Sequence, residues 1–480
     1  MRNLTMLTDL YQITMMYGYY KCKKHEDTAV YDVFFRKTAG DSGYAIMAGV
    51  DQLINYINDL HFSVEDIDYL RGLGLFDEEF LDYLRGFHFT GEIYAIPEGT
   101  VVFPSEPLVR VKAKLAEAQL IETAMLNIIN HQTLIATKAS RIVYAANGGV
   151  VMEFGLRRAQ GPDAGFYGAR AAIIGGCAST SNVLTGQMFD VAVAGTHAHS
   201  WIMSFDTELE AFRAYADVYP DACLLLVDTY DTLGSGVPNA ITVFRELREK
   251  GHEPLGIRLD SGDLAYLTKR ARKMLDEAGF PNAKICASSD LDEHIIRDLL
   301  QQGACIDSWG VGTKLITSES CPALGGVYKL AAIERNGKLV PRIKISENIW
   351  KITNPGYKKL IRIYSNTTDK AIADLIMLDE EEINCDEPIT IFDPLETWKR
   401  TTISNFHIKE LLVPIFKDGK QVYESPSVMD IQAFSMADLD TFWDEYRRFT
   451  RPHIYKVDLS DKLYEMKKKM LLSAEIKKNS

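Results

Sequence analysis

The sequence predicts an α/β fold, in which an irregular α/β barrel is flanked by an α/β domain that the N- and C-terminal segments form together. Two observations support this prediction. Between about residues 152 and 317, short apolar runs alternate with helix-like segments, and each run ends in small or polar residues. The segments on either side lack this alternation. We therefore expect residues 1–140 and 341–480 to form the flanking domain, and residues 141–340 to form the barrel that carries catalysis.

The N-terminal segment combines a strand region with a long helix. Residues 91–113 alternate apolar and polar positions between turn-forming glycines and prolines, which predicts β-strands. Residues 115–146 carry apolar side chains at helical spacing and predict an amphipathic helix.

The central region contains six apolar runs that we predict to be parallel strands covered on both faces. They end within residues 150–158, 191–200, 223–232, 255–263, 284–293 and 305–314. The helices expected between them lie within residues 168–186, 208–220, 237–251, 265–279 and 292–303. Six consecutive units favour a barrel over an open doubly wound sheet, because a barrel brings the C-terminal ends of all its strands to one mouth.

The C-terminal segment resumes strand patterns and closes with helices that have a lysine-rich end. The strand-like runs lie within residues 359–366, 374–380, 388–394 and 410–424. Near their start, basic residues surround an Asn-Pro-Gly turn: Lys344, Lys351, Lys358, Lys359 and Arg362. Phosphate binding and protection of an edge strand explain these cations equally well.

The composition is that of a globular protein and argues against a nucleic-acid or membrane partner. Of 480 residues, 46% are hydrophobic and 25% are charged, and the formal net charge is −13. The seven cysteines are scattered and form no Cys-x-x-Cys pair, which is typical of a reducing cytoplasm. The first residues do not resemble a signal peptide, and no apolar run approaches the roughly 18–20 residues that span a bilayer. We therefore expect a soluble, cytoplasmic protein.

The predicted strand ends carry residue types suited to a sugar phosphate. Aspartates bind ribose hydroxyls or Mg²⁺, arginines bind anions bidentately, and glycine N–H groups approach a phosphate closely. A structural salt bridge explains any one charged residue better, so the functional interpretation depends on their recurrence at equivalent positions. The candidates are Glu153, Arg157, Arg158, His197, His199, Ser200, Asp228, Asp231, Arg258, Asp260, Ser261, Asp263, Ser288, Ser289, Asp290, Gly310, Gly312 and Thr313.

The pair His197 and His199, in the stretch AGTHAHSW, allows another interpretation. Residues two apart on a strand face the same side, so a His-x-His pair can chelate zinc in a metal-dependent hydrolase barrel. Such a site needs further ligands from later strand ends, which supply Asp228 and Asp260 but no histidine. The sequence therefore favours an oxygen-rich Mg²⁺ site and leaves the hydrolase as a remote alternative.

Several stretches together resemble the nicotinate phosphoribosyltransferase family. They occur in collinear order over nearly the whole chain: LTDLYQITM, IPEGTVVFPSEPLVRVKA, EFGLRRAQGPDAG, GTHAHSW, LLLVDTYDT, IRLDSGDL, ASSDLDE, WGVGTKL and GGVYKL. The resemblance implies the same irregular barrel and flanking domain, as in type II phosphoribosyltransferases. It implies synthesis of nicotinate mononucleotide and pyrophosphate from nicotinate and 5-phosphoribosyl 1-pyrophosphate, in NAD biosynthesis or salvage. It also implies Mg²⁺, hydrolysis of ATP through a phosphorylated histidine, and a homodimer.

The resemblance assigns roles to two histidines and two aromatic residues. The family pattern Gly-Thr-x-Ala-His makes His199 the phosphorylated catalytic residue and leaves His197 at the variable position. Phe154 would stack on the pyridine ring of the substrate, and Tyr11 of the partner subunit would cover the other face of that ring.

The resemblance also assigns the charged and small residues. Asp260 would be a second catalytic group that binds the ribose hydroxyls, with Arg258 beside it. The other substrate-binding residues that it implies are Arg157, Arg158, Thr196, Ser200, Ser289, Asp290, Gly310, Gly312 and Thr313. An arginine in the pocket would favour nicotinate, but a nicotinamide phosphoribosyltransferase and a nucleotide-binding protein without enzymatic activity remain alternatives.

Overall fold

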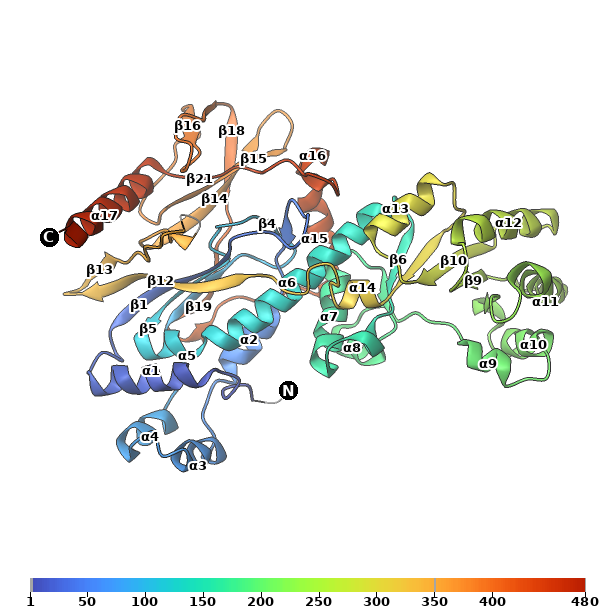
Figure 1. The fold of residues 1–480 in the computed structure, drawn as a ribbon, viewed down its shortest axis with the longest axis horizontal. Coiled ribbons are helices and arrows are strands. Elements are labelled where there is room, and N and C mark those ends of the chain that lie inside the picture. Colours follow the sequence, from blue (N-terminus) through green and yellow to red (C-terminus); the bar gives the residue numbers. More distant parts are fainter. Residues whose placement is uncertain (1–2, 349–350, 480) are drawn as a thin grey trace. The chain divides into compact units, whose positions relative to one another are not determined.

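The computed structural model describes residues 3–348 and 351–479, which form two compact units. The first unit comprises Met1–Leu134, Ala323–Pro426 and Phe434–Ser480, so it contains both ends of the chain. The second comprises Ile135–Pro322 and Ser427–Ala433. Figure 1 colours the elements of both units along the sequence.

The first unit is organised around an antiparallel sheet of seven strands. Their order is β13-β12-β1-β5-β3-β19-β20. The bounds are β1 (Thr28–Phe35), β3 (Glu92–Ala95), β5 (Val109–Lys114), β12 (Gly326–Arg335), β13 (Lys338–Pro341), β19 (Val413–Lys417) and β20 (Lys420–Gln421). Helices α1 (Leu10–Lys21), α2 (Val50–Asn58), α3 (Val64–Gly72), α4 (Glu78–Arg85) and α5 (Leu115–Leu120) also belong to this unit. Apolar residues of α1, α2, α4 and this sheet form one continuous core.

A second sheet of the first unit contains the C-terminal strands. Its order is β18-β14-β15-β21, and only β21 joins its neighbour in parallel. The bounds are β14 (Lys358–Ser365), β15 (Ala371–Leu378), β18 (Phe406–Glu410) and β21 (Val457–Leu459). Two-stranded pairs are β2 (Ala45–Ile46) with β4 (Val101–Val102), and β16 (Ile389–Phe392) with β17 (Arg400–Ile403). Helices α15 (Val428–Asp440), α16 (Asp444–Arg447) and α17 (Asp461–Asn479) complete the C-terminal region. The expected strand runs are followed by helices, as predicted, with the short strand β21 between α16 and α17.

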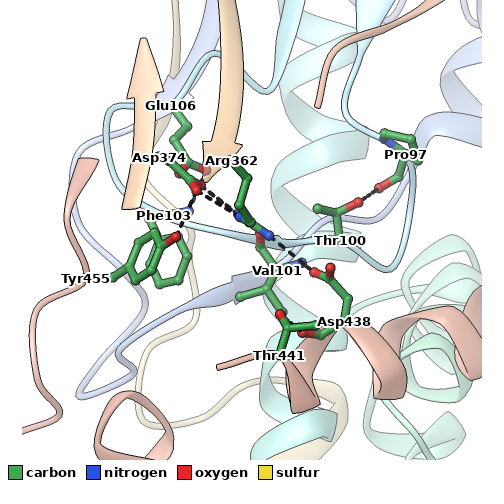
Figure 2. Close-up of polar contacts among 10 residues, drawn as sticks. All are labelled: Pro97, Thr100, Val101, Phe103, Glu106, Arg362, Asp374, Asp438, Thr441 and Tyr455. Atoms are coloured by element: carbon green, nitrogen blue, oxygen red, sulfur yellow. Dashed lines mark hydrogen bonds and ion pairs between the residues drawn. The ribbon is translucent and has the colours of Figure 1, made fainter. Parts of the chain in front are cut away.

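Two of the five basic residues around the Asn-Pro-Gly turn are internal ion-pair partners. Lys358 lies 2.7 Å from Asp32 and is almost fully buried. Arg362 is fully buried and binds Asp374 with Nη2, at 2.7 Å, and with Nε, at 2.9 Å (Figure 2). These two cations hold strands together and are not open to a ligand.

The second unit contains the predicted parallel sheet. Its strands are β6 (Val150–Glu153), β7 (Ser179–Thr180), β8 (Leu224–Leu226), β9 (Gly256–Leu259), β10 (Lys284–Ser289) and β11 (Ser308–Val311). The order β7-β6-β11-β10-β9-β8 makes the last strand in the chain pair with the first, which is the cyclic order of a barrel. Among the described residues no ladder joins β8 to the β7 side, so the mixed α/β fold is established and barrel closure stays a prediction.

Helices connect the strands of this sheet in the expected alternation. They are α7 (Pro162–Ile174), α8 (Val183–Phe189), α9 (His199–Met203), α10 (Glu208–Val218), α11 (Val237–Glu249), α12 (Leu264–Glu277), α13 (Glu293–Gln301) and α14 (Thr313–Ile316). Helices α10 to α13 pack side by side in chain order (Figure 1). The predicted helices within 208–220, 237–251, 265–279 and 292–303 are therefore confirmed.

Three local predictions were wrong. Residues 168–186 do not form one helix, because Gly176 adopts φ +106° after α7 and Asn182 caps a new helix, α8, with β7 between them. Residues 191–200 do not form a strand but make a single bridge, from Val193 to Thr180, before α9 begins. The helix expected over 115–146 is divided at Ile121 into α5 and α6 (Glu122–Ala145).

No helix in the described part of the chain is both long enough and apolar enough to cross a membrane.

Candidate active site

The C-terminal ends of the parallel strands lie at one edge of the sheet in the second unit. Glu153 at the end of β6 pairs with Val311, and Ser288 of β10 pairs with Gly310. The backbone N–H of Phe154 then donates to the carbonyl of Val311 at 2.8 Å. Residues that are far apart in the sequence therefore meet at this edge.

Arg258, near the end of β9, is the centre of a hydrogen-bond network. Its Nε donates to Ser288 Oγ at 2.8 Å, and its Nη1 donates to Thr196 Oγ1 at 3.1 Å. Its Nη2 donates to Asp260 Oδ1 at 3.2 Å. All three nitrogen atoms are engaged, which fixes the plane of the guanidinium group.

Asp260 is held in its ionised form. Burial opposes ionisation, but the hydrogen bond from the Ser288 hydroxyl and the positive charge of Arg258 outweigh it and lower the pKa of Asp260. The carboxylate is about one-third exposed, at 35%, so it can reach a ligand at the edge of the sheet.

Asp228 connects the loops that follow β8 and β9. Its Oδ2 accepts a hydrogen bond from the backbone N–H of Asp260, at 2.8 Å, and from Ser261 Oγ, at 2.7 Å. Its Oδ1 is buried and accepts no hydrogen bond from the residues that the structure describes. A buried carboxylate oxygen of this kind is available to a hydrogen-bond donor or a cation.

The ring of Phe154 packs closely against the backbone of β11. A Cβ atom on Gly310 would lie 2.6 Å from Cδ2 of Phe154, so the ring occupies the space that any other residue at position 310 would fill. The guanidinium carbon of Arg258 lies 5.8 Å from the centroid of the same ring. An aromatic face and a fixed cation are therefore adjacent.

The two histidines of AGTHAHSW have different environments. His197 is 8% exposed, its Nε2 accepts the backbone N–H of Leu226 at 3.3 Å, and its ring packs on Tyr215. Burial lowers its pKa to about 4. His199 is half-buried at the start of α9, and its Nδ1 lies 3.1 Å from the hydroxyl of Thr229. The geometry makes His197 a packed structural residue and leaves His199 accessible.

Glu153 is a structural member of the strand-end set. It is fully buried; Oε2 accepts the Thr180 hydroxyl at 2.6 Å, and Oε1 accepts the backbone N–H of Gly155. Burial raises its pKa, and both hydrogen bonds oppose the rise. Glu153 therefore ties β6 to β7 and supports the turn that follows Phe154.

The remaining predicted residues of the second unit are mostly exposed around this network. Their positions are a 3₁₀ turn, Leu156–Arg158, the start of α9, the end of β10 and the start of α14. They are Arg157, Arg158, Ser200, Ser289 and Asp290, which are exposed, and Gly312 and Thr313, which are half-buried. Asp231 and Asp263 are exposed too, and each accepts a backbone N–H in the first turn of the helix that follows it, from Gly234 and from Tyr266, both at 2.9 Å. Tyr11 belongs to the first unit, where it lies on α1 and is 49% exposed.

Two contacts of the site were not predicted from the sequence. Ser288, one of the strand-end candidates, bonds both Arg258 and Asp260. The resemblance assigns a substrate-binding role to its neighbour Ser289, which stays a prediction. Thr229 was not a candidate, although it follows Asp228 directly and contacts His199. Side chains alternate between the two sides of β10, and this alternation could have separated Ser288 from Ser289. For Thr229, the only signal was its position in the loop after β8.

The arrangement can bind a polar, anionic molecule next to an aromatic group. It offers a fixed arginine, an ionised aspartate, a carboxylate oxygen without a partner and an accessible imidazole. In the described part of the chain, no three histidine, cysteine or acidic side chains gather closely enough to hold a metal ion by themselves. The alternative His-x-His chelate also lacks the strand on which it depends, since residues 197 and 199 precede and begin a helix.

Comparisons with known proteins find one family over nearly the whole chain. The family models described as the nicotinate phosphoribosyltransferase N-terminal domain, family and C-terminal domain match residues 6–130, 150–366 and 357–467. A nicotinate phosphoribosyltransferase of Bacillus subtilis is 49% identical over 97% of this chain and 94% of its own length. The Caenorhabditis elegans protein of that name is 37% identical, over 96% and 92% of the two chains.

Solved structures are similar as well. The crystal structure of human nicotinic acid phosphoribosyltransferase superimposes with a TM-score of 0.86 at 29% identity, and covers 96% of this chain and 99% of that one. A nicotinate-nucleotide pyrophosphorylase from Pyrococcus furiosus shares the fold, with a TM-score of 0.70 at 21% identity over 92% and 96% of the two chains.

Proposed function

The chain belongs to the nicotinate phosphoribosyltransferase family, and from that premise we propose that it joins nicotinate to 5-phosphoribosyl 1-pyrophosphate, with the help of ATP. It is an enzyme of NAD biosynthesis. The products are nicotinate mononucleotide and pyrophosphate. The observation that carries the proposal is the pair Arg258 and Asp260 beside the ring of Phe154.

The residue types fit the two substrates. Phe154 offers an aromatic face for the flat pyridine ring, and Arg258, held by three hydrogen bonds, offers a positive charge for a carboxylate or phosphate. The preference for nicotinate over nicotinamide follows from that charge. Arg157 and Arg158, both exposed beside Phe154, would add to the binding of anionic groups.

The ionised Asp260 suits the reacting sugar. Departure of pyrophosphate leaves positive charge near the anomeric carbon of the ribose, and a nearby carboxylate stabilises that charge. The same group accepts hydrogen bonds from ribose hydroxyls. The glycines at 310 and 312, with Thr313, Ser289 and Asp290, would surround the ribose and its 5′-phosphate.

Mg²⁺ fits the oxygen atoms of this site. It prefers oxygen ligands, keeps several waters and is commonly held by one or two carboxylates together with substrate phosphates. Asp228, with a buried Oδ1 that lacks a partner, and Asp260 would contribute those carboxylates. When bound, Mg²⁺ neutralises charge on the departing pyrophosphate.

His199 is the proposed acceptor of a phosphoryl group from ATP. Its ring is accessible, whereas His197 is packed against Tyr215 and uses its Nε2 for a backbone N–H. A neutral imidazole is a competent nucleophile near pH 7. Thr196 and Ser200, which flank this segment, would contact the bound substrates.

We further propose an irregular barrel in the second unit, a homodimer and a cytoplasmic location. The cyclic strand order supports the barrel. The exposed aromatic ring of Tyr11 supports a role at the partner's site, where it would cover the second face of the pyridine ring. Seven free cysteines fit a reducing compartment.

One assay tests the proposed function. Purified protein is incubated with nicotinate, 5-phosphoribosyl 1-pyrophosphate and Mg²⁺, with and without ATP, and the mononucleotide and pyrophosphate are quantified. We expect both products, more of them with ATP, and weak competition by nicotinamide. No mononucleotide under any condition contradicts the proposal, and preferential use of nicotinamide contradicts the assigned base.

The same assay tests the role of the two histidines. We expect His199→Asn to abolish both stimulation by ATP and transfer of radiolabelled γ-phosphate to the protein. His197→Asn is the matched control, which should still become labelled but unfold more easily, by about 1–3 kcal/mol, because a buried ring and its hydrogen bond are lost. Label that persists in His199→Asn and disappears in His197→Asn would reverse the assignment.

A further inference from the structure

Ser288 lies between the two charged groups proposed to bind the substrates, but it is itself shielded from solvent. It belongs to β10, is 4% exposed and pairs with Gly310 of β11. Its neighbour Ser289 alternates to the exposed side of the strand. A buried side chain in this position can affect the site through the residues that it contacts, Arg258 and Asp260.

The hydroxyl of Ser288 is engaged with two protein partners. Its oxygen accepts a hydrogen bond from Arg258 Nε at 2.8 Å, and its proton is donated to Asp260 Oδ1. A serine hydroxyl has one proton to donate, so Ser288 has none left for a substrate. Because the side chain is also buried, we expect its effect on the reaction to pass through Arg258 and Asp260.

The two bonds have complementary effects on the charged pair. The bond from Arg258 fixes the plane of the guanidinium group, together with the bond from Arg258 to Thr196. The bond to Asp260 orients one of its two carboxylate oxygens, the same oxygen that Arg258 contacts.

We propose that Ser288 is a positioning residue, which holds Arg258 and Asp260 in the geometry that binds the phosphoribosyl substrate. This inference rests on the proposed function, since it assumes that these two residues contact that substrate. Ser288 makes no contact with the reacting atoms, and so it is not a catalytic residue.

The groups that hold Asp260 come from several elements. Arg258 lies on β9, and Asp228, in the loop after β8, accepts a hydrogen bond from the backbone N–H of Asp260. Loss of the Ser288 hydroxyl removes one hydrogen bond from Asp260 and one from Arg258, so both side chains lose part of what fixes their orientation.

The test compares Ser288→Ala and Ser288→Thr with the wild-type enzyme, and measures kcat and KM for 5-phosphoribosyl 1-pyrophosphate separately. For Ser288→Ala we expect kcat/KM to fall by roughly 10- to 100-fold, the range for removing one hydrogen bond to a charged group. We expect the loss to appear mainly as a raised KM, because the two groups that bind this substrate are no longer held in place. Ser288→Thr keeps the hydroxyl and should restore that KM. Ser308→Ala, a matched change at the other end of the neighbouring strand β11, should leave kcat and KM unchanged.

Each outcome decides between the two proposals. A wild-type enzyme that forms no mononucleotide contradicts the proposed function itself. An active wild-type enzyme with an equally active Ser288→Ala contradicts only the role of Ser288. A loss that lies wholly in kcat, or one that Ser288→Thr does not restore, also overturns that role, because a general structural defect is not repaired by returning the hydroxyl alone. Thermal unfolding of each variant confirms that the fold is retained.

Discussion

Glu106 and Asp374 are two carboxyl groups that lie side by side in the interior of the first unit (Figure 2). Asp374 accepts hydrogen bonds from Arg362 and, at 2.9 Å, from the hydroxyl of Tyr455. Glu106 is fully buried, and its Oε2 accepts the backbone N–H of Phe103 at 2.8 Å. Burial raises the pKa of Glu106 well above its ordinary value, and the charge of Asp374 raises it further. Glu106 therefore holds its proton more tightly in the folded protein than in the unfolded chain.

This proton links stability to pH. A carboxyl group with a raised pKa in the folded state releases its proton on unfolding, so its contribution is complete below the unfolded pKa of about 4.3 and is lost as the pH rises toward the folded pKa. The loss amounts to about 1.4 kcal/mol per pH unit. Glu106→Gln keeps a donor toward Asp374 and an acceptor for Phe103 but cannot titrate.

We expect Glu106→Gln to weaken the decline of the free energy of unfolding between about pH 5 and pH 8, measured by denaturant titration, by up to about 1.4 kcal/mol per pH unit. The matched control is Glu382→Gln, since Glu382 is an exposed carboxylate of the same unit. Equal slopes in both variants and in the wild-type protein would show that Glu106 is ionised in the folded state.

Strand β11 packs closely against Phe154, which follows β6, and this close approach requires a glycine at position 310. A Cβ atom at this position would lie 2.6 Å from the ring of Phe154 and 3.2 Å from the Cβ of Ser288. In Gly310→Ala the ring must therefore move. We expect a destabilisation of about 1–3 kcal/mol, typical of overpacking, and a raised KM for nicotinate.

The control for this variant is Gly72→Ala. Gly72 ends α3, has no left-handed φ angle and has open space where a Cβ atom would lie, so the same substitution should be close to neutral there. An unchanged KM for nicotinate in Gly310→Ala would mean that the position of Phe154 does not affect binding of that substrate.

The elements that were predicted correctly from the sequence have an apolar pattern that is continuous along the element itself and needs no contact with distant residues. Helices α11, α12 and α13 show an apolar stripe, and the apolar cores of β8, β9 and β10 are short and continuous. Around residues 175–200 the chain instead depends on tertiary contacts. Val193 makes one bridge to Thr180, and Asn182 caps α8, and neither is visible as a periodic pattern.

The site could be predicted to the level of strand ends but not of individual side chains. The strand-end rule predicted that Arg258 and Asp260 would lie at one edge, because parallel strands end together, whereas Phe154 was implied only by the family resemblance. The choice between Ser288 and Ser289, however, depends on which side of β10 faces Arg258. That is a matter of register and twist, which a single sequence does not encode locally.

At the scale of the whole molecule, the proposed role of Tyr11 depends on its place in the first unit, while the other proposed site residues belong to the second. Tyr11 is on the first turn of α1, and its neighbour Gln12 is fully buried and donates to Glu122 at 3.1 Å. The helix is thus anchored by one residue and presents the next, an exposed aromatic ring. In the proposed homodimer, this ring completes the site of the partner subunit.

Mixing two defective enzymes tests this arrangement. Tyr11→Ala should raise the KM for nicotinate, and His199→Asn should lose the stimulation by ATP. In a mixed dimer of the two, one site combines an intact His199 with an intact Tyr11 from the other subunit. Random exchange of equal amounts makes half of the dimers mixed, so about a quarter of all sites should recover ATP-stimulated activity at low nicotinate concentration.

Mixing His199→Asn with Asp260→Asn should recover none, because both residues belong to the same unit of one chain and every site keeps one defect. Recovery in neither mixture, despite exchange verified by differently tagged chains, would place Tyr11 at the site of its own subunit or outside any site.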